Sequence, residues 1–130
     1  MKTCPWNRIL MVEDDPDIQT VARLALEAVG GFTVSVCGTG RDALDATPVF
    51  SPDLILLDVM MPDMDGVSVL KALRADSQMA GTPVIFLTAK AQPQEIAQFR
   101  ELGALDVIPK PFDPMTLSDT IREIWKRAND

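Results

Sequence analysis

Residues 54–58 read Leu-Ile-Leu-Leu-Asp, and this stretch decides the fold. Four large apolar residues stand in a row, with the turn residues Pro52-Asp53 directly before them and a carboxylate directly after. A short apolar run bounded in this way is typical of a strand that is buried on both faces, as in a parallel sheet. Similar runs punctuate the rest of the chain, at residues 9–12, 32–36, 84–87 and 107–108. The sequence therefore predicts five short buried strands.

Helical patterns lie between these runs. Asp15-Pro16 is typical of a helix start, because aspartate caps the first turn and proline suits the first helical position. An apolar stripe follows and stops at Gly30-Gly31, and it consists of Ile18, Val21, Ala22, Ala25 and Val29. Asp113-Pro114 repeats the start signal before a last helix, whose buried stripe is expected to be Ile121, Ile124, Trp125 and Ala128. Shorter helices are predicted at residues 40–47, 66–75 and 93–102.

Strand and helix thus alternate five times, which is the (βα)5 pattern of an α/β protein. Crossovers between parallel strands are nearly always right-handed, so helices are expected on both faces of the sheet. Five units fit a doubly wound, flavodoxin-like parallel sheet of five strands in the order 2-1-3-4-5. We expect one domain over residues 8–128, behind a short N-terminal lead at residues 1–7.

The composition argues against several classes of function. The 130 residues carry a net charge of −7, which argues against direct binding to nucleic acid, because that binding depends on basic contacts to phosphates. No apolar stretch approaches the roughly 20 residues of a membrane span, so no membrane association is expected. The chain has no histidine, which excludes histidine-based triads and histidine metal sites. Cys4 and Cys37 are expected to be free thiols in a reducing, cytoplasmic compartment.

Polar residues follow four of the predicted strands at the point where each strand ends. Glu13 and Asp14 follow the first run, Asp58 the third, Thr88 the fourth and Lys110 the fifth. In a doubly wound sheet of this order, these four strands are neighbours around the switch point, and ligands bind beyond their carboxyl ends. The five side chains are therefore expected to converge on one crevice.

The charges in this crevice predict a bound cation. Two carboxylates about 5 Å apart repel each other by about 3 kcal/mol at an effective dielectric constant of about 20. Glu13, Asp14 and Asp58 would therefore recruit a cation, and hard oxygen ligands favour Mg²⁺, with Mn²⁺ able to substitute. Lys110 adds a positive charge and Thr88 a hydroxyl donor. This set suits phosphoryl transfer to the Asp58 carboxylate, where catalysis is mainly positioning and charge neutralisation.

The chain resembles the receiver domain of two-component response regulators over nearly its whole length. The segments that carry the resemblance, in matching order and spacing, are residues 9–16 (ILMVEDDP), 54–66 (LILLDVMMPDMDG), 84–89 (VIFLTA) and 110–112 (KPF). The resemblance implies that Asp58 is the phospho-acceptor. It also implies that Asp14 binds Mg²⁺ directly, that Glu13 binds it directly or through water, and that Met60 contributes its backbone carbonyl.

The resemblance assigns further roles around the acceptor. Thr88 and Lys110 would contact the phosphoryl group, and the bond between Lys110 and Pro111 would be cis. Ala89 would keep the approach to the acceptor open. Met60 and Lys90, each two residues beyond a site residue, are expected to tune the lifetime of the acyl phosphate.

Val107 departs from the family pattern, which commonly has an aromatic residue three positions before the lysine. In the family this aromatic side chain rotates to report phosphorylation at the surface, and valine cannot make that movement. The switch is therefore expected to be led by Thr88 and the loop that follows it, with an altered surface readout.

The resemblance also implies partners. A sensor histidine kinase or a histidine phosphotransfer protein would supply the phosphoryl group, and a downstream effector or output domain would respond. A homodimer through the helix at 93–102, the strand at 107–108 and the last helix is a further option. The chain would be a switch and not an enzyme beyond its own phosphotransfer and dephosphorylation. No output domain is expected within the 130 residues, which leaves open a stand-alone regulator or part of a longer protein.

Other interpretations of the same residues stay in competition. A helix N-terminus alone favours acids, which explains Asp15 but not the matching positions of Asp58 and Lys110. A phosphatase of the haloacid dehalogenase type needs a second aspartate two residues after the nucleophile, where this chain has Met60. A receiver-like binding module without phosphorylation is favoured only by Val107. Flavin binding needs a Ser/Thr-rich loop after the first strand, and a calcium loop at 61–72 lacks two of its oxygen ligands.

Overall fold

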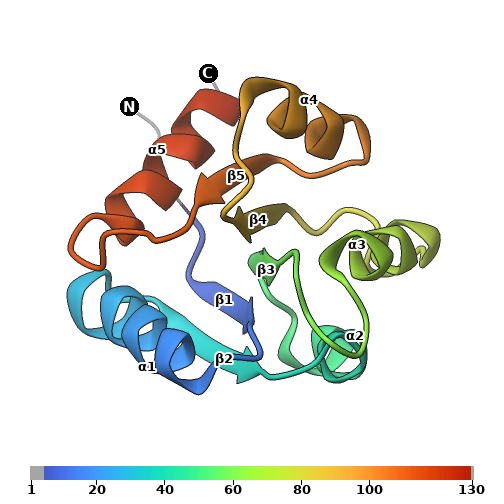
Figure 1. The fold of residues 1–130 in the computed structure, drawn as a ribbon. Helices are drawn as coiled ribbons and strands as arrows, with labels where there is room; N and C mark the ends of the chain where they lie inside the picture. Colours follow the sequence, from blue (N-terminus) through green and yellow to red (C-terminus); the bar gives the residue numbers. More distant parts are fainter. Residues whose placement is uncertain (1–4, 130) are drawn as a thin grey trace.

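The computed structural model describes residues 5–129 of the chain. Its centre is a five-stranded parallel sheet in the order β2-β1-β3-β4-β5, as predicted (Figure 1). The strands are β1 (Arg8–Val12), β2 (Thr33–Cys37), β3 (Leu54–Asp58), β4 (Val84–Thr88) and β5 (Asp106–Pro109). Each predicted run is therefore confirmed as a strand, with its bounds shifted by one residue at most.

Helices cover both faces of this sheet. They are α1 (Pro16–Leu24), which continues as the π-helical turn η1 (Ala25–Val29), then α2 (Gly40–Phe50), α3 (Gly66–Ala75), α4 (Pro93–Glu101) and α5 (Leu117–Ala128). Figure 1 shows α1 and α5 on one face and α2, α3 and α4 on the other. Alternate strand residues supply the two cores: Ile9 and Met11 face α1 and α5, whereas Leu10 and Val12 face the other three helices. The sheet is thus a buried platform whose strand ends carry the polar residues.

The helix after β1 starts as predicted but ends differently. Asp15 caps α1, because its side chain accepts from the backbone N–H of Asp17 at 2.8 Å. The stripe is only partly confirmed: Ala22 and Ala25 are buried, while Val21 and Val29 are 40% and 50% exposed. In η1 the N–H of Gly30 bonds to the carbonyl of Ala25, five residues back. This wider turn changes the helical period, and Leu26 is buried in place of Val29.

The start of α5 also differs from the prediction. Asp113 caps a preceding turn: its carboxylate accepts from the N–H of Met115, and its carbonyl accepts from the N–H of Leu117, the first residue of α5. The helix therefore begins three residues after Pro114 and not at it. Its buried stripe is confirmed at Ile121, Ile124 and Trp125, whereas Ala128, in the last position of the helix, is exposed.

The end of α2 is a further difference. The helix continues past residue 47 to Phe50 and contains Pro48. Proline lacks the N–H that would bond to the carbonyl four residues back, which is why the sequence favours an earlier end. Beside it, the buried hydroxyl of Thr47 donates to the carbonyl of Ala43 at 2.6 Å. The helix ends at Phe50, and the next residue, Ser51, has a left-handed backbone conformation with a φ of 51°.

Two remaining expectations concern the membrane and the thiols. Within residues 5–129, no helix combines the length and apolarity that crossing a bilayer requires. Cys37 is a buried free cysteine, as expected. Cys4 lies outside the described residues, together with the first part of the predicted lead.

Candidate functional site

The predicted acidic cluster forms at the carboxyl ends of β1 and β3. These strands are hydrogen-bonded neighbours, with Val12 paired to Leu57, so the residues that follow them lie side by side. Glu13, Asp14 and Asp58 each place a carboxylate oxygen within 4.8 Å of the other two. Glu13 and Asp58 are buried, at 1% and 3% exposure, whereas Asp14 is exposed.

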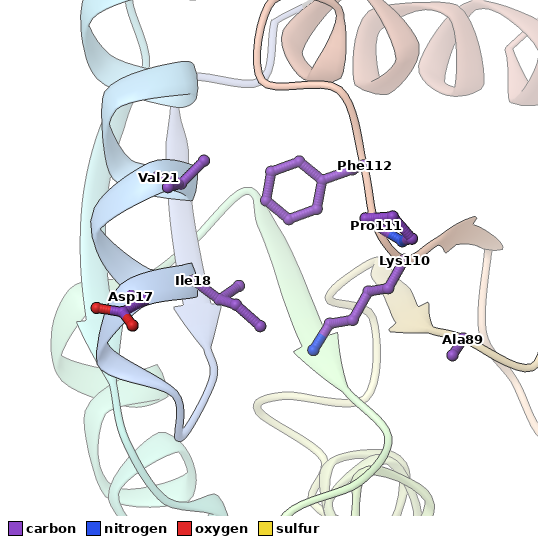
Figure 2. A pocket seen from close by; sticks show the side chains of 7 residues that line it. All are labelled: Asp17, Ile18, Val21, Ala89, Lys110, Pro111 and Phe112. Carbon is purple, nitrogen blue, oxygen red and sulfur yellow. The ribbon is translucent and has the colours of Figure 1, made fainter.

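Lys110 completes the charge pattern from the end of β5. Its Nζ lies 2.5 Å from Oε1 of Glu13 and 3.2 Å from Oδ1 of Asp58. Figure 2 shows the lysine side chain reaching to the tip of β3. Lys110 therefore pairs with both carboxylates, and Glu13 is the nearer partner. One ammonium is therefore shared by two buried carboxylates.

The charge of Lys110 alone does not neutralise this cluster of carboxylates. The pKa of Glu13 is raised to about 7, mainly by burial and also by the neighbouring Asp58, although the hydrogen bond and charge of Lys110 oppose this rise. Burial also lowers the pKa of Lys110, but its hydrogen bonds and charge attraction to Glu13 and Asp58 outweigh burial and leave that pKa raised. The lysine stays charged, and the carboxylates retain an unbalanced negative charge that a further cation would neutralise.

The donor set fits a magnesium ion. Carboxylate oxygens are hard ligands, and the exposure of Asp14 leaves one side of the cluster open to water, which Mg²⁺ keeps in its coordination shell. Among residues 5–129, this is the only group of three or more acidic, cysteine or histidine side chains with suitable spacing. The Asp63–Asp65 turn forms no such group. Asp63 instead accepts from the N–H of Gly40, and Asp65 caps α3.

The loop after β3 folds back onto the side chain of Asp58. The N–H of Met60 donates to Oδ1 of Asp58 at 3.2 Å, which holds this backbone segment at the site. Gly66 bonds through its N–H to the carbonyl of Val59 at 2.9 Å. A Cβ at Gly66 would lie 2.5 Å from the carbonyl oxygen of Asp58, so only glycine permits this close approach.

Thr88 ends β4, which is the neighbour of β3 in the sheet. The threonine is buried, and its hydroxyl accepts from the N–H of Lys90 at 3.0 Å. Ala89 and Lys90 are exposed beside it. Val107 lies elsewhere: it is 7% exposed and packs in the core that faces α2, α3 and α4. The structure therefore brings together every predicted site residue except Val107.

A mostly apolar pocket of about 390 Å³ adjoins the site (Figure 2). It lies between α1 and the loop after β5, where the bond between Lys110 and Pro111 is cis, as expected. One wall is the side chain of Lys110, whose ammonium binds the carboxylates. The lining residues are Asp17, Ile18, Val21, Ala89, Lys110, Pro111 and Phe112.

Sequence reasoning missed one residue that contacts the site. Gln19 lies on α1, and its side-chain amide donates to the backbone carbonyl of Glu13 at 2.5 Å. The only signal in the sequence is position, because the residue lies one turn beyond the cap Asp15 and can therefore face the preceding loop.

Comparisons with known proteins agree with this geometry. The family model described as response regulator receiver domain matches residues 9–122. The DNA-binding response regulator MtrA of Mycobacterium tuberculosis is 41% identical over 124 residues, which cover 95% of this chain and 53% of that protein. The transcriptional regulatory protein CpxR of Escherichia coli is 44% identical over 123 residues, covering 95% and 51%. The chain thus spans about half the length of these relatives.

Solved structures give the same result for the fold. The chemotaxis protein CheY4 of Vibrio cholerae superposes with a TM-score of 0.83 at 32% identity, covering 92% of this chain and 98% of that one. A signal receiver domain of a histidine kinase from Syntrophus aciditrophicus gives a TM-score of 0.79 at 31% identity, covering 93% and 91%. With the family match, the sheet order and the acidic cluster in agreement, the chain belongs to the response regulator receiver domain family.

Proposed function

We propose that Asp58 accepts a phosphoryl group in a two-component phosphorelay, with Mg²⁺ or Mn²⁺ bound beside it. The observation that carries this proposal is the shared contact of Lys110 with Asp58 and Glu13 inside a cluster of three carboxylates. Asp14, Asp58 and the backbone carbonyl of Met60 would hold the ion, and Glu13 would bind it directly or through water. When bound, the ion neutralises charge on the incoming phosphoryl oxygens.

The residues of the chain supply the rest of the chemistry. A carboxylate oxygen of Asp58 attacks the phosphorus of a phosphohistidine on the donor, the P–N bond breaks, and the released imidazole takes a proton from solvent. Lys110 is positioned to pair with a phosphoryl oxygen, because its ammonium already contacts the attacked carboxylate. The Thr88 hydroxyl accepts from Lys90 and still has its own hydrogen to donate to a phosphoryl oxygen. Hydrolysis of the acyl phosphate by water later restores the carboxylate.

The structure suggests where the donor protein would bind. A sensor histidine kinase or histidine phosphotransfer protein must bring its imidazole to Asp58, so it needs surface directly beside the site. The apolar pocket between α1 and the loop after β5 provides such surface, and Val21 on its rim is 40% exposed. Ala89 also lines this pocket, and its small side chain leaves the approach to Asp58 open.

The remaining roles follow from the same proposal. The unit that acts is the domain at residues 8–128, as a switch and not as an enzyme with an external substrate. It works in the cytoplasm, a reducing compartment that suits the free thiol of Cys37. Its output is a downstream effector or output domain, or a homodimer through α4, β5 and α5, and the net charge of −7 disfavours direct contact with nucleic acid. Because Val107 is buried and lacks a ring, Thr88 leads the switch.

Beryllofluoride tests this proposal, because it forms a phosphoryl mimic on an aspartate only when the metal is present. We expect bound fluoride signals, distinct from free beryllofluoride, by ¹⁹F NMR with Mg²⁺, and we expect them to vanish in Asp58→Asn and after chelation. Amide shifts should cluster around Thr88 and α4. The absence of bound fluoride in a folded, Mg²⁺-loaded chain would overturn the proposal.

A further inference from the structure

The loop that joins β1 to α1 carries two of the three carboxylates, and its backbone leaves the sheet at that point. The strand pairing of β1 ends at Val12, which pairs with Cys37 on one side and with Leu57 on the other. The N–H of Glu13 still reaches the carbonyl of Cys37, at 3.0 Å. The carbonyl of Glu13 is instead bonded by a side chain, the amide of Gln19.

The position of Gln19 is set by its place in the helix and in the fold. The backbone N–H of Gln19 bonds to the carbonyl of the cap residue Asp15 at 2.9 Å, so the glutamine sits in the first turns of a capped helix. On the other side, a Cβ at Gly38 would lie 3.7 Å from Nε2 of Gln19, which places the amide next to the loop after β2. The backbone of the donor residue is therefore fixed in the helix, and its amide lies between the acidic loop and the loop after β2.

The charges on this loop explain why such an anchor matters. Glu13 and Asp14 face Asp58, and the mutual repulsion of the three carboxylates pushes the loop away from β3. Lys110 forms ion pairs with Glu13 and Asp58 but not with the exposed Asp14. A neutral donor such as glutamine holds the backbone without adding a positive charge that would compete with a cation.

We propose that Gln19 is a positioning residue, which holds the loop at residues 13–15 so that Glu13 and Asp14 face Asp58 before a cation binds. This inference rests on the proposed function only for the identity of the cation. The amide of Gln19 would hold the backbone of this loop in position, as hydrogen bonds between strands hold the backbone elsewhere in the sheet.

The test uses the full chain with Gln19→Met, which keeps the length of the side chain and removes the donor. Gln98→Met, on the exposed surface of α4, is the matched control. We expect Mg²⁺ binding, measured by calorimetry, to weaken about three- to tenfold in Gln19→Met, as the loss of one hydrogen bond predicts. In the metal-free chain, amide exchange at residues 13–15 should accelerate by a similar factor. The control should change neither quantity.

A second variant separates positioning from general stability. Gln19→Lys restores a donor, so it should recover slow exchange at residues 13–15 while its charge still weakens Mg²⁺ binding. Unchanged exchange and unchanged Mg²⁺ affinity in Gln19→Met would overturn the inference, as would faster exchange spread equally over the whole sheet. If the parent chain failed to bind Mg²⁺, the proposed function would fail, while the exchange data on the metal-free chain would still decide the role of Gln19.

Discussion

The ammonium of Lys110 lies 3.2 Å from the carboxylate of Asp58, although β4 separates the strands that carry them. The contact exists because both residues stand at the carboxyl ends of parallel strands, where a long side chain can cross one neighbour. The same ammonium also binds Glu13. Lys110 is therefore the common partner of two buried acids, and this arrangement has measurable consequences.

Removal of this lysine should destabilise the metal-free protein. In Lys110→Met, two buried carboxylates lose their cation, and leaving a buried charge unpaired is costly. Because the lysine side chain is 18% exposed, we expect a loss of about 1–3 kcal/mol in the free energy of unfolding, measured by urea titration with chelator present. The exposed Lys90→Met serves as the control. Equal stability of the two variants would show that the ion pairs of Lys110 contribute nothing to the free energy of unfolding.

The pH dependence of stability should report on Glu13. The pKa of its folded form is raised to about 7, mainly by burial, and lies above the unfolded value of 4.5, so the folded protein binds more protons between these two values. The free energy of unfolding of the metal-free protein should therefore fall as the pH rises from 5 to 8, by about 1–3 kcal/mol. Glu13→Gln should flatten this dependence. A parent protein that gained stability over this range would contradict the assignment.

The hydroxyl of Thr88 should matter more for the response than for acceptance of the phosphoryl group. Thr88→Val removes the acceptor of the Lys90 N–H and the donor to a phosphoryl oxygen, but leaves Asp58 and the acidic cluster intact. We expect beryllofluoride to bind still, with amide shifts in α4 reduced at least twofold. Thr88→Ser, which keeps the hydroxyl, should retain the shifts. Amide shifts in α4 that are as large in Thr88→Val as in the parent would show that Thr88 takes no part in the switch.

Lys90 should tune the lifetime of the acyl phosphate. Its side chain is exposed, and its backbone is bonded to Thr88 at the edge of the site. In Lys90→Glu, a negative charge beside the phosphoryl group would raise the energy of the phosphorylated state, so we expect dephosphorylation to accelerate several-fold. Lys71→Glu, on the exposed side of α3, provides a charge-matched control. Identical decay rates in the parent and Lys90→Glu would refute this role.

Much of the fold could be predicted because the signals were local. The β3 stretch at 54–58 is so apolar that burial on both faces is its only stable placement, and the cap Asp15 needs only its neighbours to act. The π-helical turn could not be predicted, since it depends on tertiary contacts. Ser118 of α5 donates to the carbonyl of Ala25, and Arg122 donates to the carbonyl of Gly30. Both bonds join residues more than 90 positions apart.

Most of the site could be predicted from the strand order. Glu13, Asp14, Asp58 and Lys110 come together because they end strands whose order the chain pattern indicates. The contact of Gln19 with the site could not be predicted, because a glutamine on a helix is usually a solvated side chain and its partner here is a backbone atom.

The acceptor role of Asp58 is tested most directly by mass spectrometry after incubation with acetyl phosphate. We expect that the intact chain gains one phosphoryl group when Mg²⁺ is present, that the modification maps to Asp58, and that it is absent in Asp58→Asn and in chelator. A folded chain that stays unmodified under these conditions, or that is modified equally in Asp58→Asn, would contradict it.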